Sequence, residues 1–199
     1  MSKRVVIVEN GGANTASLRH ALARLGVEAE LTSSSAAIRE ASHVILPGVG
    51  AAQDAMRRLR THGLDTIIPA LTQPVLGICL GMQLLYEASE EGSVRCLGAI
   101  PGAAHRLTAF PGRPIPHMGW NELTPTASVP LLEGIESGEH AYFVHSYAVA
   151  IGPETVAATH YGEPFSAVVA RKNFFGTQFH PERSASTGAR ILGNFLALT

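Results

Sequence analysis

Cysteine is scarce in this sequence of 199 residues, which contains only Cys79 and Cys96. Two cysteines cannot form the dense disulfide framework of a small secreted domain. The longest apolar runs, Val5–Val8 and Pro74–Leu80, are far shorter than the roughly 20 residues that a membrane-spanning helix needs. The first residues also lack the apolar stretch of a signal peptide. We therefore expect a cytoplasmic protein that does not contact a membrane.

Charge of either sign is also sparse. Charged residues make up 16% of the chain, and 15 basic residues face 16 acidic ones, for a formal net charge of −1. Proteins that bind nucleic acid through its phosphates usually carry a basic excess, so we expect no nucleic-acid partner. Hydrophobic residues reach 46%, which excludes a disordered or fibrous chain and is typical of a well-buried core.

Short apolar runs alternate with longer amphipathic stretches in the first half of the chain. The pattern predicts strands over residues 4–8, 27–31, 43–46 and 75–78, and helices over residues 15–25, 51–61 and 80–88. Such alternation predicts an α/β fold with an open, mostly parallel, flavodoxin-like sheet flanked by helices. Ligands bind beyond the carboxyl ends of such strands. We therefore expect the site at the loops 9–14 and 47–50 and at the turn around Cys79.

The second half is rich in strands and turns. It predicts strands within residues 141–149, 155–160, 166–171 and 174–179, added antiparallel to the parallel core, and a final helix over 187–198. No linker or repeat interrupts the chain, so residues 1–199 are expected to form a single domain.

A nucleophile is predicted where a buried strand meets a helix, at Gly77-Ile78-Cys79-Leu80-Gly81. Small flanking residues allow the tight turn that exposes a nucleophile above the sheet. The start of a helix favours a thiolate, and the N–H of Leu80 can stabilise an oxyanion. The alternative is a small buried cysteine that only fills space. Cys96 has no comparable setting and is expected to be structural.

The general base is predicted among nine histidines. His117 and His145 lie in polar-aromatic settings that allow a role in a site. His180 is favoured because it ends a strand and Glu182 follows two residues later. Side chains two apart in an extended chain project to the same side, so Glu182 can hold one ring nitrogen while the other faces the thiol. This order of residues is unlike that of α/β-hydrolases, in which the acid precedes the histidine.

Two segments resemble the class I glutamine amidotransferases: Gly77–Gln83, with Cys79, and Gln178–Glu182, with His180. Three more resemble the glutaminase subunits of imidazole glycerol phosphate synthases. They are Pro47-Gly48-Val49-Gly50, His117-Met118-Gly119-Trp120-Asn121 and Tyr142-Phe143-Val144-His145-Ser146-Tyr147. The resemblance extends over essentially the whole chain, and it implies one class I glutamine amidotransferase domain.

The resemblance implies hydrolysis of glutamine to glutamate and ammonia by Cys79, His180 and Glu182, with no metal ion and no cofactor. It implies an oxyanion hole at Gly48, Val49 and Leu80. It also implies that glutamine is held around Gly50, Gln83, Glu91, Ser146 and Tyr147. Two of these assignments have plain alternatives: Gln83 as an exposed helix residue, and Glu91 as a solvated loop carboxylate.

The resemblance further implies a partner, a cyclase subunit with a (βα)8 barrel, in a heterodimer of histidine biosynthesis. The cyclase uses channelled ammonia to make imidazole glycerol phosphate and aminoimidazole carboxamide ribotide. The chain itself has no phosphate-binding glycine motif for the cyclase substrate. The expected interface residues are His117, Met118, Trp120, Asn121, Tyr142 and Arg183. For Met118 and Trp120 the alternative is core packing.

Three positions depart from the family pattern: Ala13, Ala52 and Arg183 replace a glycine, an aromatic residue and a lysine. We expect these three differences to affect docking of the partner, not the chemistry of Cys79, His180 and Glu182. Two other functions stay open: an amidotransferase subunit for a different acceptor, and a non-catalytic flavodoxin-like interaction module. The His117–Asn121 segment speaks against the first, and an unreactive Cys79 would favour the second.

Overall fold

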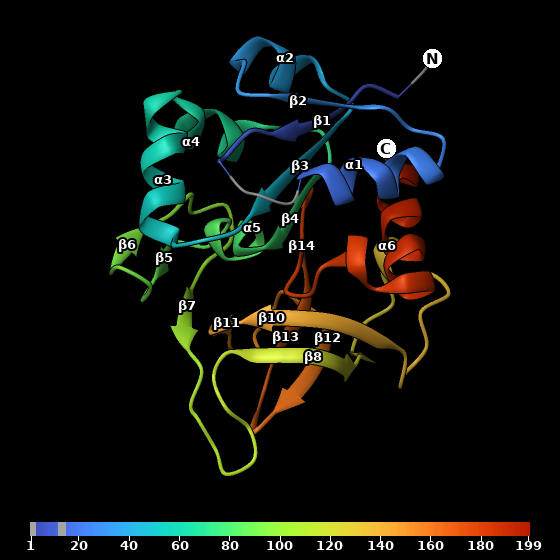
Figure 1. The fold of residues 1–199 in the computed structure, drawn as a ribbon. Helices are drawn as coiled ribbons and strands as arrows, with labels where there is room; N and C mark the ends of the chain where they lie inside the picture. Colours follow the sequence, from blue (N-terminus) through green and yellow to red (C-terminus); the bar gives the residue numbers. More distant parts are fainter. Residues whose placement is uncertain (1–2, 12–14) are drawn as a thin grey trace.

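The computed structural model describes residues 3–11 and 15–199, built around a sheet of eight strands (Figure 1). The order across the sheet is β2-β1-β3-β4-β14-β13-β12-β9. The first five strands in this order are parallel, and the last three are antiparallel additions. The strands span Val5–Val8 (β1), Ala29–Thr32 (β2), His43–Gly48 (β3), Val75–Cys79 (β4), Thr124–Pro125 (β9), Thr155–Tyr161 (β12), Glu163–Arg171 (β13) and Phe174–Thr177 (β14). The predicted α/β fold with a mostly parallel core is confirmed.

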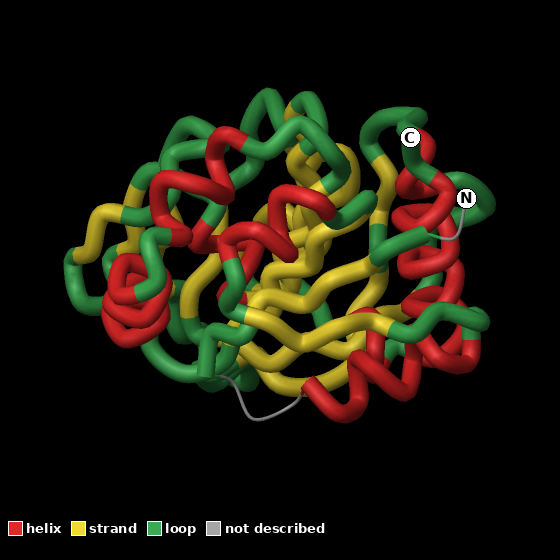
Figure 2. Tube along the Cα trace, turned by 90° about the horizontal axis from the view of Figure 1, so that it is seen from above, coloured by secondary structure: helices red, strands yellow, loops and turns green. Residues whose placement is uncertain are grey.

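Helices cover both faces of this sheet (Figure 2). Val5 and Ile7 of β1 share one apolar cluster with α1 and α6, whereas Val6 and Val8 share the other with α2, α3, α4 and α5. The alternation follows from the period of two along a strand. The helices span Thr15–Arg24 (α1), Ser35–Glu40 (α2), Ala52–Thr61 (α3), Leu64–Ile67 (α4), Leu80–Leu84 (α5) and Ala185–Ala197 (α6). None of the helices in the described ranges has the length and apolarity to cross a membrane.

Two smaller sheets come from the second half of the chain. β8 (His117–Glu122) pairs antiparallel with β10 (His140–His145), and Figure 1 shows this pair crossing the antiparallel strands of the large sheet. A four-stranded sheet has the order β11-β7-β5-β6. Its strands span Tyr147–Val149 (β11), Ala103–Arg106 (β7), Ala88–Ser89 (β5) and Val94–Arg95 (β6).

Most predicted elements agree with the structure to within three residues at each end, but the helix over 80–88 is too long. α5 ends at Leu84. The N–H of Leu97 then donates to the carbonyl of Leu84, and the N–H of Gly98 donates to that of Tyr86. These long-range bonds replace the bonds that a longer helix would make along its own chain.

The strand predicted within 141–149 is in fact two strands of different sheets, β10 and β11, separated at Ser146. The Ser146 carbonyl accepts a hydrogen bond from the N–H of Leu107, outside the β8–β10 pair. In the predicted loop 9–14, residues 12–14 lie outside the described residues, so the effect of Ala13 stays a prediction.

Backbone packs directly on backbone where β3 and β4 meet α5. A Cβ on Gly81 would lie 1.8 Å from the carbonyl oxygen of Leu46, and a Cβ on Gly48 would lie 2.5 Å from the nitrogen of Gly81. A Cβ on Gly77 would lie 2.6 Å from the nitrogen of Met82, in the first turn of α5. The glycines that flank Cys79 are therefore required by close packing, as expected for a tight nucleophile turn.

We expect Gly81→Ala to lower the free energy of unfolding by about 3 kcal/mol or more, because β3 and α5 must separate to admit the methyl group. Denaturant unfolding measures the change. Gly193→Ala is the matched control, because a Cβ at this position of α6 meets no atom within 4 Å. Alanine is the better helix former, so the control should be neutral or stabilising by up to about 1 kcal/mol. Equal stabilities of the two variants would contradict the packing argument.

Candidate active site

Cys79 is the last residue of β4 and directly precedes α5. Its backbone has φ 54° and ψ −112°, a conformation that L-residues rarely adopt. Strain of this kind occurs mainly where the surrounding structure holds a functional residue in place. The Sγ of Cys79 lies 3.7 Å from the carbonyl oxygen of Val144 in β10, to which the thiol donates. The side chain is thus held at the carboxyl end of a central strand.

His180 follows β14, the neighbour of β4 in the sheet. Its Nδ1 lies 2.9 Å from Oε1 of Glu182, and both side chains are buried. The backbone N–H of His180 donates to the carbonyl of Tyr142, and the hydroxyl of Ser184 donates to the carbonyl of His180. Since Glu182 binds Nδ1, the other ring nitrogen is left for Cys79.

Opposing effects determine the protonation of His180. Burial lowers its pKa, but hydrogen bonds with Cys79 and Glu182, together with the charges of these two groups, outweigh burial and raise the pKa to about 10. The charged form of the imidazole is therefore favoured while the sulfur and Glu182 carry negative charge. The second carboxylate oxygen of Glu182 is buried and has no hydrogen-bond partner within residues 3–11 and 15–199. The arrangement can hold a positive imidazolium beside sulfur.

A pocket of about 390 Å³ opens over Cys79 and His180. All predicted oxyanion and glutamine-binding residues line this pocket. They are Gly48, Val49, Gly50, Leu80, Gln83, Glu91, Ser146 and Tyr147. Glu182 lies behind His180, outside the pocket. The structure therefore brings together residues that are distant in the sequence, at the sheet edge where the alternating pattern predicts a site.

Gln83 and Glu91 are both held by hydrogen bonds. Gln83 is 3% exposed, and its Nε2 lies 2.7 Å from the carbonyl oxygen of Tyr147, so it is not an exposed helix residue. Glu91 Oε2 accepts a hydrogen bond of 2.8 Å from the N–H of Ala52, at the start of α3. The carboxylate caps that helix and is not freely solvated. Their contact with glutamine stays a prediction.

Four of the six predicted interface residues, Met118, Trp120, Tyr142 and Arg183, lie together beside the pocket. Met118 and Trp120 of β8 are 63% and 53% exposed, so core packing is not their role. The rings of Trp120 and Tyr142 make an edge contact, with centroids 6.0 Å apart. The guanidinium of Arg183 lies 4.3 Å from the centre of the Tyr142 ring, and Arg183 also lines the pocket.

His117 does not belong to that exposed face. It is only 2% exposed, because β8 alternates and turns His117 inward while Met118 faces outward. Asn121 is half-buried and donates to the carbonyl of His160 over 3.0 Å. His117 thus lies inside the fold rather than on the exposed face, and its contact with a partner stays a prediction.

Two residues of the site, Gln178 and His145, could not be assigned a definite role from the sequence. The sequence pattern assigns no role to Gln178, although it stands two positions before His180, a spacing that places two side chains on the same side of an extended chain. Its Nε2 lies 3.7 Å from Sγ of Cys79. His145 was noted only as a possible site residue. It lines the pocket and bonds to His117, with His145 Nε2 and His117 Nδ1 separated by 3.0 Å.

Burial keeps the His117–His145 pair neutral. Burial lowers the pKa of His145 to about 3, and burial with the nearby charge of Arg113 lowers that of His117 to about 4. In the unfolded chain both histidines take up protons near pH 6.5, whereas the folded chain resists until lower pH. Unfolding is therefore favoured progressively as pH falls from 6.5 towards 4.

We expect the free energy of unfolding to fall between pH 6.5 and 4.5 less steeply in His117→Gln and His145→Gln variants than in the wild type. Each histidine contributes a slope of at most about 1.4 kcal/mol per pH unit. Denaturant unfolding at a series of pH values gives the free energy of unfolding at each pH. The change of this free energy with pH is then compared among the variants, whatever its absolute value in each. His20→Gln, at an exposed position of α1, should keep the wild-type slope. Identical slopes in all four proteins would contradict a buried neutral pair.

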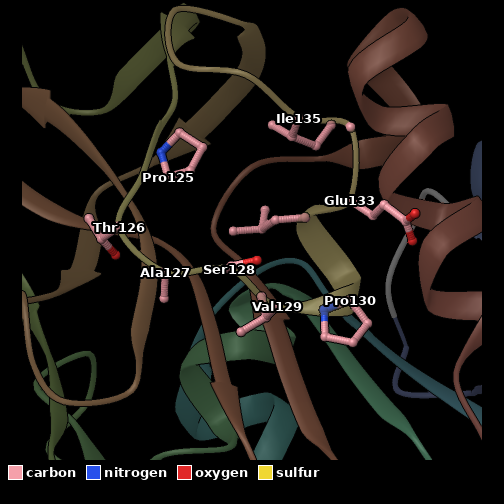
Figure 3. Close-up of a pocket in the computed structure, with 10 residues that line it drawn as sticks. Pro125, Thr126, Ala127, Ser128, Val129, Pro130, Glu133 and Ile135 are labelled. Carbon is pink, nitrogen blue, oxygen red and sulfur yellow. The ribbon is translucent and has the colours of Figure 1, made fainter.

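A larger hollow of about 820 Å³ lies away from this chemistry (Figure 3). It is lined by a loop between Pro125 and Ile135, mostly by small and apolar residues, and Glu133 is the one acidic side chain in its lining. It contains none of the predicted site residues, and its lining has neither a cysteine nor a histidine.

Comparisons with known proteins agree with this geometry. The family model described as "Glutamine amidotransferase class-I" matches residues 6–198. Proteins named "Imidazole glycerol phosphate synthase subunit HisH" from Xanthomonas euvesicatoria and Xylella fastidiosa are each 53% identical to the chain. The alignments cover 98% of the chain and, respectively, 98% and 97% of the relative. A crystal structure described as a glutamine amidotransferase superimposes with a TM-score of 0.75 at 22% identity, covering 96% of both chains. The chain therefore belongs to the class-I glutamine amidotransferases, and within them to the family of imidazole glycerol phosphate synthase subunits HisH.

Proposed function

We propose that the chain hydrolyses glutamine to glutamate and ammonia with Cys79, His180 and Glu182. The sulfur of Cys79 attacks the side-chain amide carbon, and His180 donates a proton to the departing ammonia. A thioester between Cys79 and the glutamyl group remains. Water then attacks this thioester while His180 accepts its proton, and glutamate leaves as the sulfur is restored. Glu182 holds the imidazole in place and stabilises its positive charge.

The observation that supports this proposal most is the position of His180 between Cys79 and Glu182 at the pocket. A protonated imidazole beside sulfur is the form that can release ammonia. We infer that the N–H of Leu80 and the peptide at Gly48–Val49 stabilise the oxyanion, because Gly48 is the register partner of Cys79 in neighbouring strands.

We infer that the free ammonium and carboxylate of glutamine bind in the remainder of the pocket. Glu91 offers the negative charge for the ammonium group. Gly50, Gln83, Ser146 and Tyr147 surround the rest of the ligand. The chain then acts as one catalytic domain over residues 1–199, with a family match that covers nearly all of it.

We further propose that the partner is the cyclase subunit of imidazole glycerol phosphate synthase, a (βα)8 barrel, in a heterodimer of histidine biosynthesis. The names of the relatives support this, since they are subunits of that synthase. The exposed face at Met118, Trp120, Tyr142 and Arg183 supports it too, because aromatic and arginine side chains are common interface anchors. Ammonia loses its nucleophilicity when water protonates it, so an interface beside the pocket favours direct transfer.

The experiment that tests this function uses glutamine labelled with ¹⁵N in the side-chain amide. The chain is mixed with a purified cyclase subunit, the phosphorylated ribulosyl imidazole-carboxamide acceptor and an excess of unlabelled ammonium. We expect ¹⁵N in the imidazole ring of the product, which mass spectrometry detects. Product that carries only unlabelled nitrogen would contradict channelling, and absence of product would contradict this acceptor.

A further inference from the structure

Gln178 is fully buried beside the proposed nucleophile, although none of the steps above uses it. Its side-chain amide lies between two other site residues. Its Nε2 lies 3.7 Å from Sγ of Cys79, and its Oε1 lies 2.9 Å from Nε2 of Gln83. Gln178 thus connects the sulfur to the residue expected to contact glutamine.

The direction of these hydrogen bonds is fixed by a backbone carbonyl. The carbonyl oxygen of Tyr147 can only accept, and it lies 2.7 Å from the amide of Gln83, so this group must be the Nε2 donor. The same NH₂ group donates its second hydrogen to Gln178, whose facing atom must be Oε1. The other end of the Gln178 amide, an N–H donor, therefore points to the sulfur of Cys79. A flipped Gln178 would place two donors against each other.

The carbonyl of Tyr147 is itself held by His145, which is in turn hydrogen-bonded to His117. His145 Nδ1 lies 2.9 Å from it and must donate. Since His145 is neutral, its Nε2 accepts from His117 Nδ1, and the remaining nitrogen of His117 faces the amide of Asn121 at 3.4 Å. One arrangement of hydrogens satisfies the whole series from Asn121 to Cys79. The amide of Gln178 therefore has a rigid support.

We propose that Gln178 is a positioning residue that holds a permanent N–H donor against the sulfur of Cys79 and so favours the reactive thiolate. The inference rests on the proposed function, because it gives Cys79 the role of nucleophile. In the thiol form, the hydrogen of Cys79 can be donated to the carbonyl of Val144, whereas the thiolate has no hydrogen to donate. The N–H of Gln178 bonds sulfur in both forms, and it bonds the negatively charged one more strongly.

The test measures the rate at which iodoacetamide alkylates Cys79 as a function of pH, with mass spectrometry to separate Cys79 from Cys96. Gln178→Met removes the donor without adding charge, and Gln178→Glu keeps an acceptor for Gln83 but offers no N–H to sulfur. Besides Cys79, the titratable and charged groups around the pocket are unchanged in these variants; they are His180, Glu182, Glu91, His145, Tyr147 and Arg183. Gln73→Glu is the matched control, since Gln73 bonds to the carbonyl of Ile38 and precedes β4, at the end of the strand opposite Cys79.

We expect the alkylation midpoint of both Gln178 variants to rise by about one pH unit or more, which is the loss expected for a hydrogen bond to a charged group. In the complex with the cyclase, kcat for glutamine hydrolysis should fall about tenfold or more, while KM changes little. The control should match the wild type in both measurements. A wild-type midpoint and kcat in Gln178→Met would overturn the proposal.

A second measurement covers the case in which the Gln178 variants fail to fold. In the wild-type chain, the side-chain amide signals of Gln178 in a ¹⁵N NMR spectrum should shift with the same pH midpoint as the alkylation of Cys79. Amide signals that do not shift at this pH midpoint would overturn the proposal. Because alkylation and NMR need no glutamine, they also distinguish failure of this inference from failure of the proposed hydrolysis.

Discussion

Replacing Cys79 with alanine is expected to reduce glutamine hydrolysis in the complex by about 10³-fold or more, because the lining of the pocket contains no second thiol to form the covalent intermediate. The fold should persist, since the substitution removes a single sulfur atom from a site held by glycine packing around it. The binding of the cyclase should persist as well, because the exposed face at Trp120 is unchanged. Glutamate release, thermal unfolding and co-purification with the cyclase measure these three properties.

Cys96→Ala provides the matched control for Cys79→Ala. Cys96 is also a free cysteine, but burial raises its pKa to about 11, and the one hydrogen-bond partner of its sulfur among residues 3–11 and 15–199 is the carbonyl of Val94. It should keep wild-type activity. Glutamate release by Cys79→Ala at the wild-type rate, or loss of activity in Cys96→Ala alone, would contradict the assignment of the nucleophile.

Glu182→Gln is expected to lower kcat by about 10²- to 10⁴-fold, as is usual when the carboxylate that orients a catalytic histidine is neutralised. The substitution preserves the shape of a buried side chain but removes the negative charge beside Nδ1 of His180. Loss of this charge lowers the pKa of His180 from its raised value and weakens the imidazolium. Since Glu182 does not line the pocket, KM for glutamine should change far less than kcat.

The matched control for Glu182→Gln is Glu133→Gln. Glu133 is exposed and lines the remote hollow between Pro125 and Ile135. Its substitution removes the same charge without affecting His180, so kinetics should stay at the wild-type level. If Glu182→Gln raised KM and left kcat unchanged, Glu182 would be acting on substrate binding rather than on His180.

The parallel half of the fold could be predicted because its signals are local. Strands such as 43–46 and 75–78 are continuous apolar runs, and Gly77 and Gly81 mark the tight turn at Cys79. The parts that could not be predicted depend on contacts between distant segments. The return of β14 beside β4, the division of 141–149 between two sheets and the early end of α5 all depend on such pairings.

In the candidate site, too, one part follows from local sequence and another depends on contacts between distant segments. His180 and Glu182 are two positions apart, so their proximity could be predicted, although Glu182 lies in a 3-10 turn over Pro181–Arg183 and not in the extended segment that the sequence suggests. The support of Gln178 involves Gln83, Tyr147 and His145, which meet only in the folded chain. His117 illustrates the limit of pattern recognition: its segment marks the family, yet strand alternation turns its side chain into the interior.

Of the three functions compatible with the sequence, the family match disfavours a non-catalytic module, and the strained backbone of Cys79 does so independently. A different acceptor would have to be served by a different partner on the same exposed face. Substitution of Trp120 tests this face. If the affinity for the cyclase did not change, the cyclase would dock on another surface.

The central claim is a glutaminase that depends on its partner, and its most direct test is glutamate release by the purified chain, alone and with the cyclase subunit and acceptor. We predict slow release by the isolated chain and a large increase on mixing, because we expect the neighbouring subunit to set the oxyanion peptide at Gly48–Val49. The Cys79→Ala variant should stay inactive in both conditions. High release by the chain alone, unchanged by cyclase and acceptor, would contradict partner dependence, and no release in either condition would contradict the proposed activity itself.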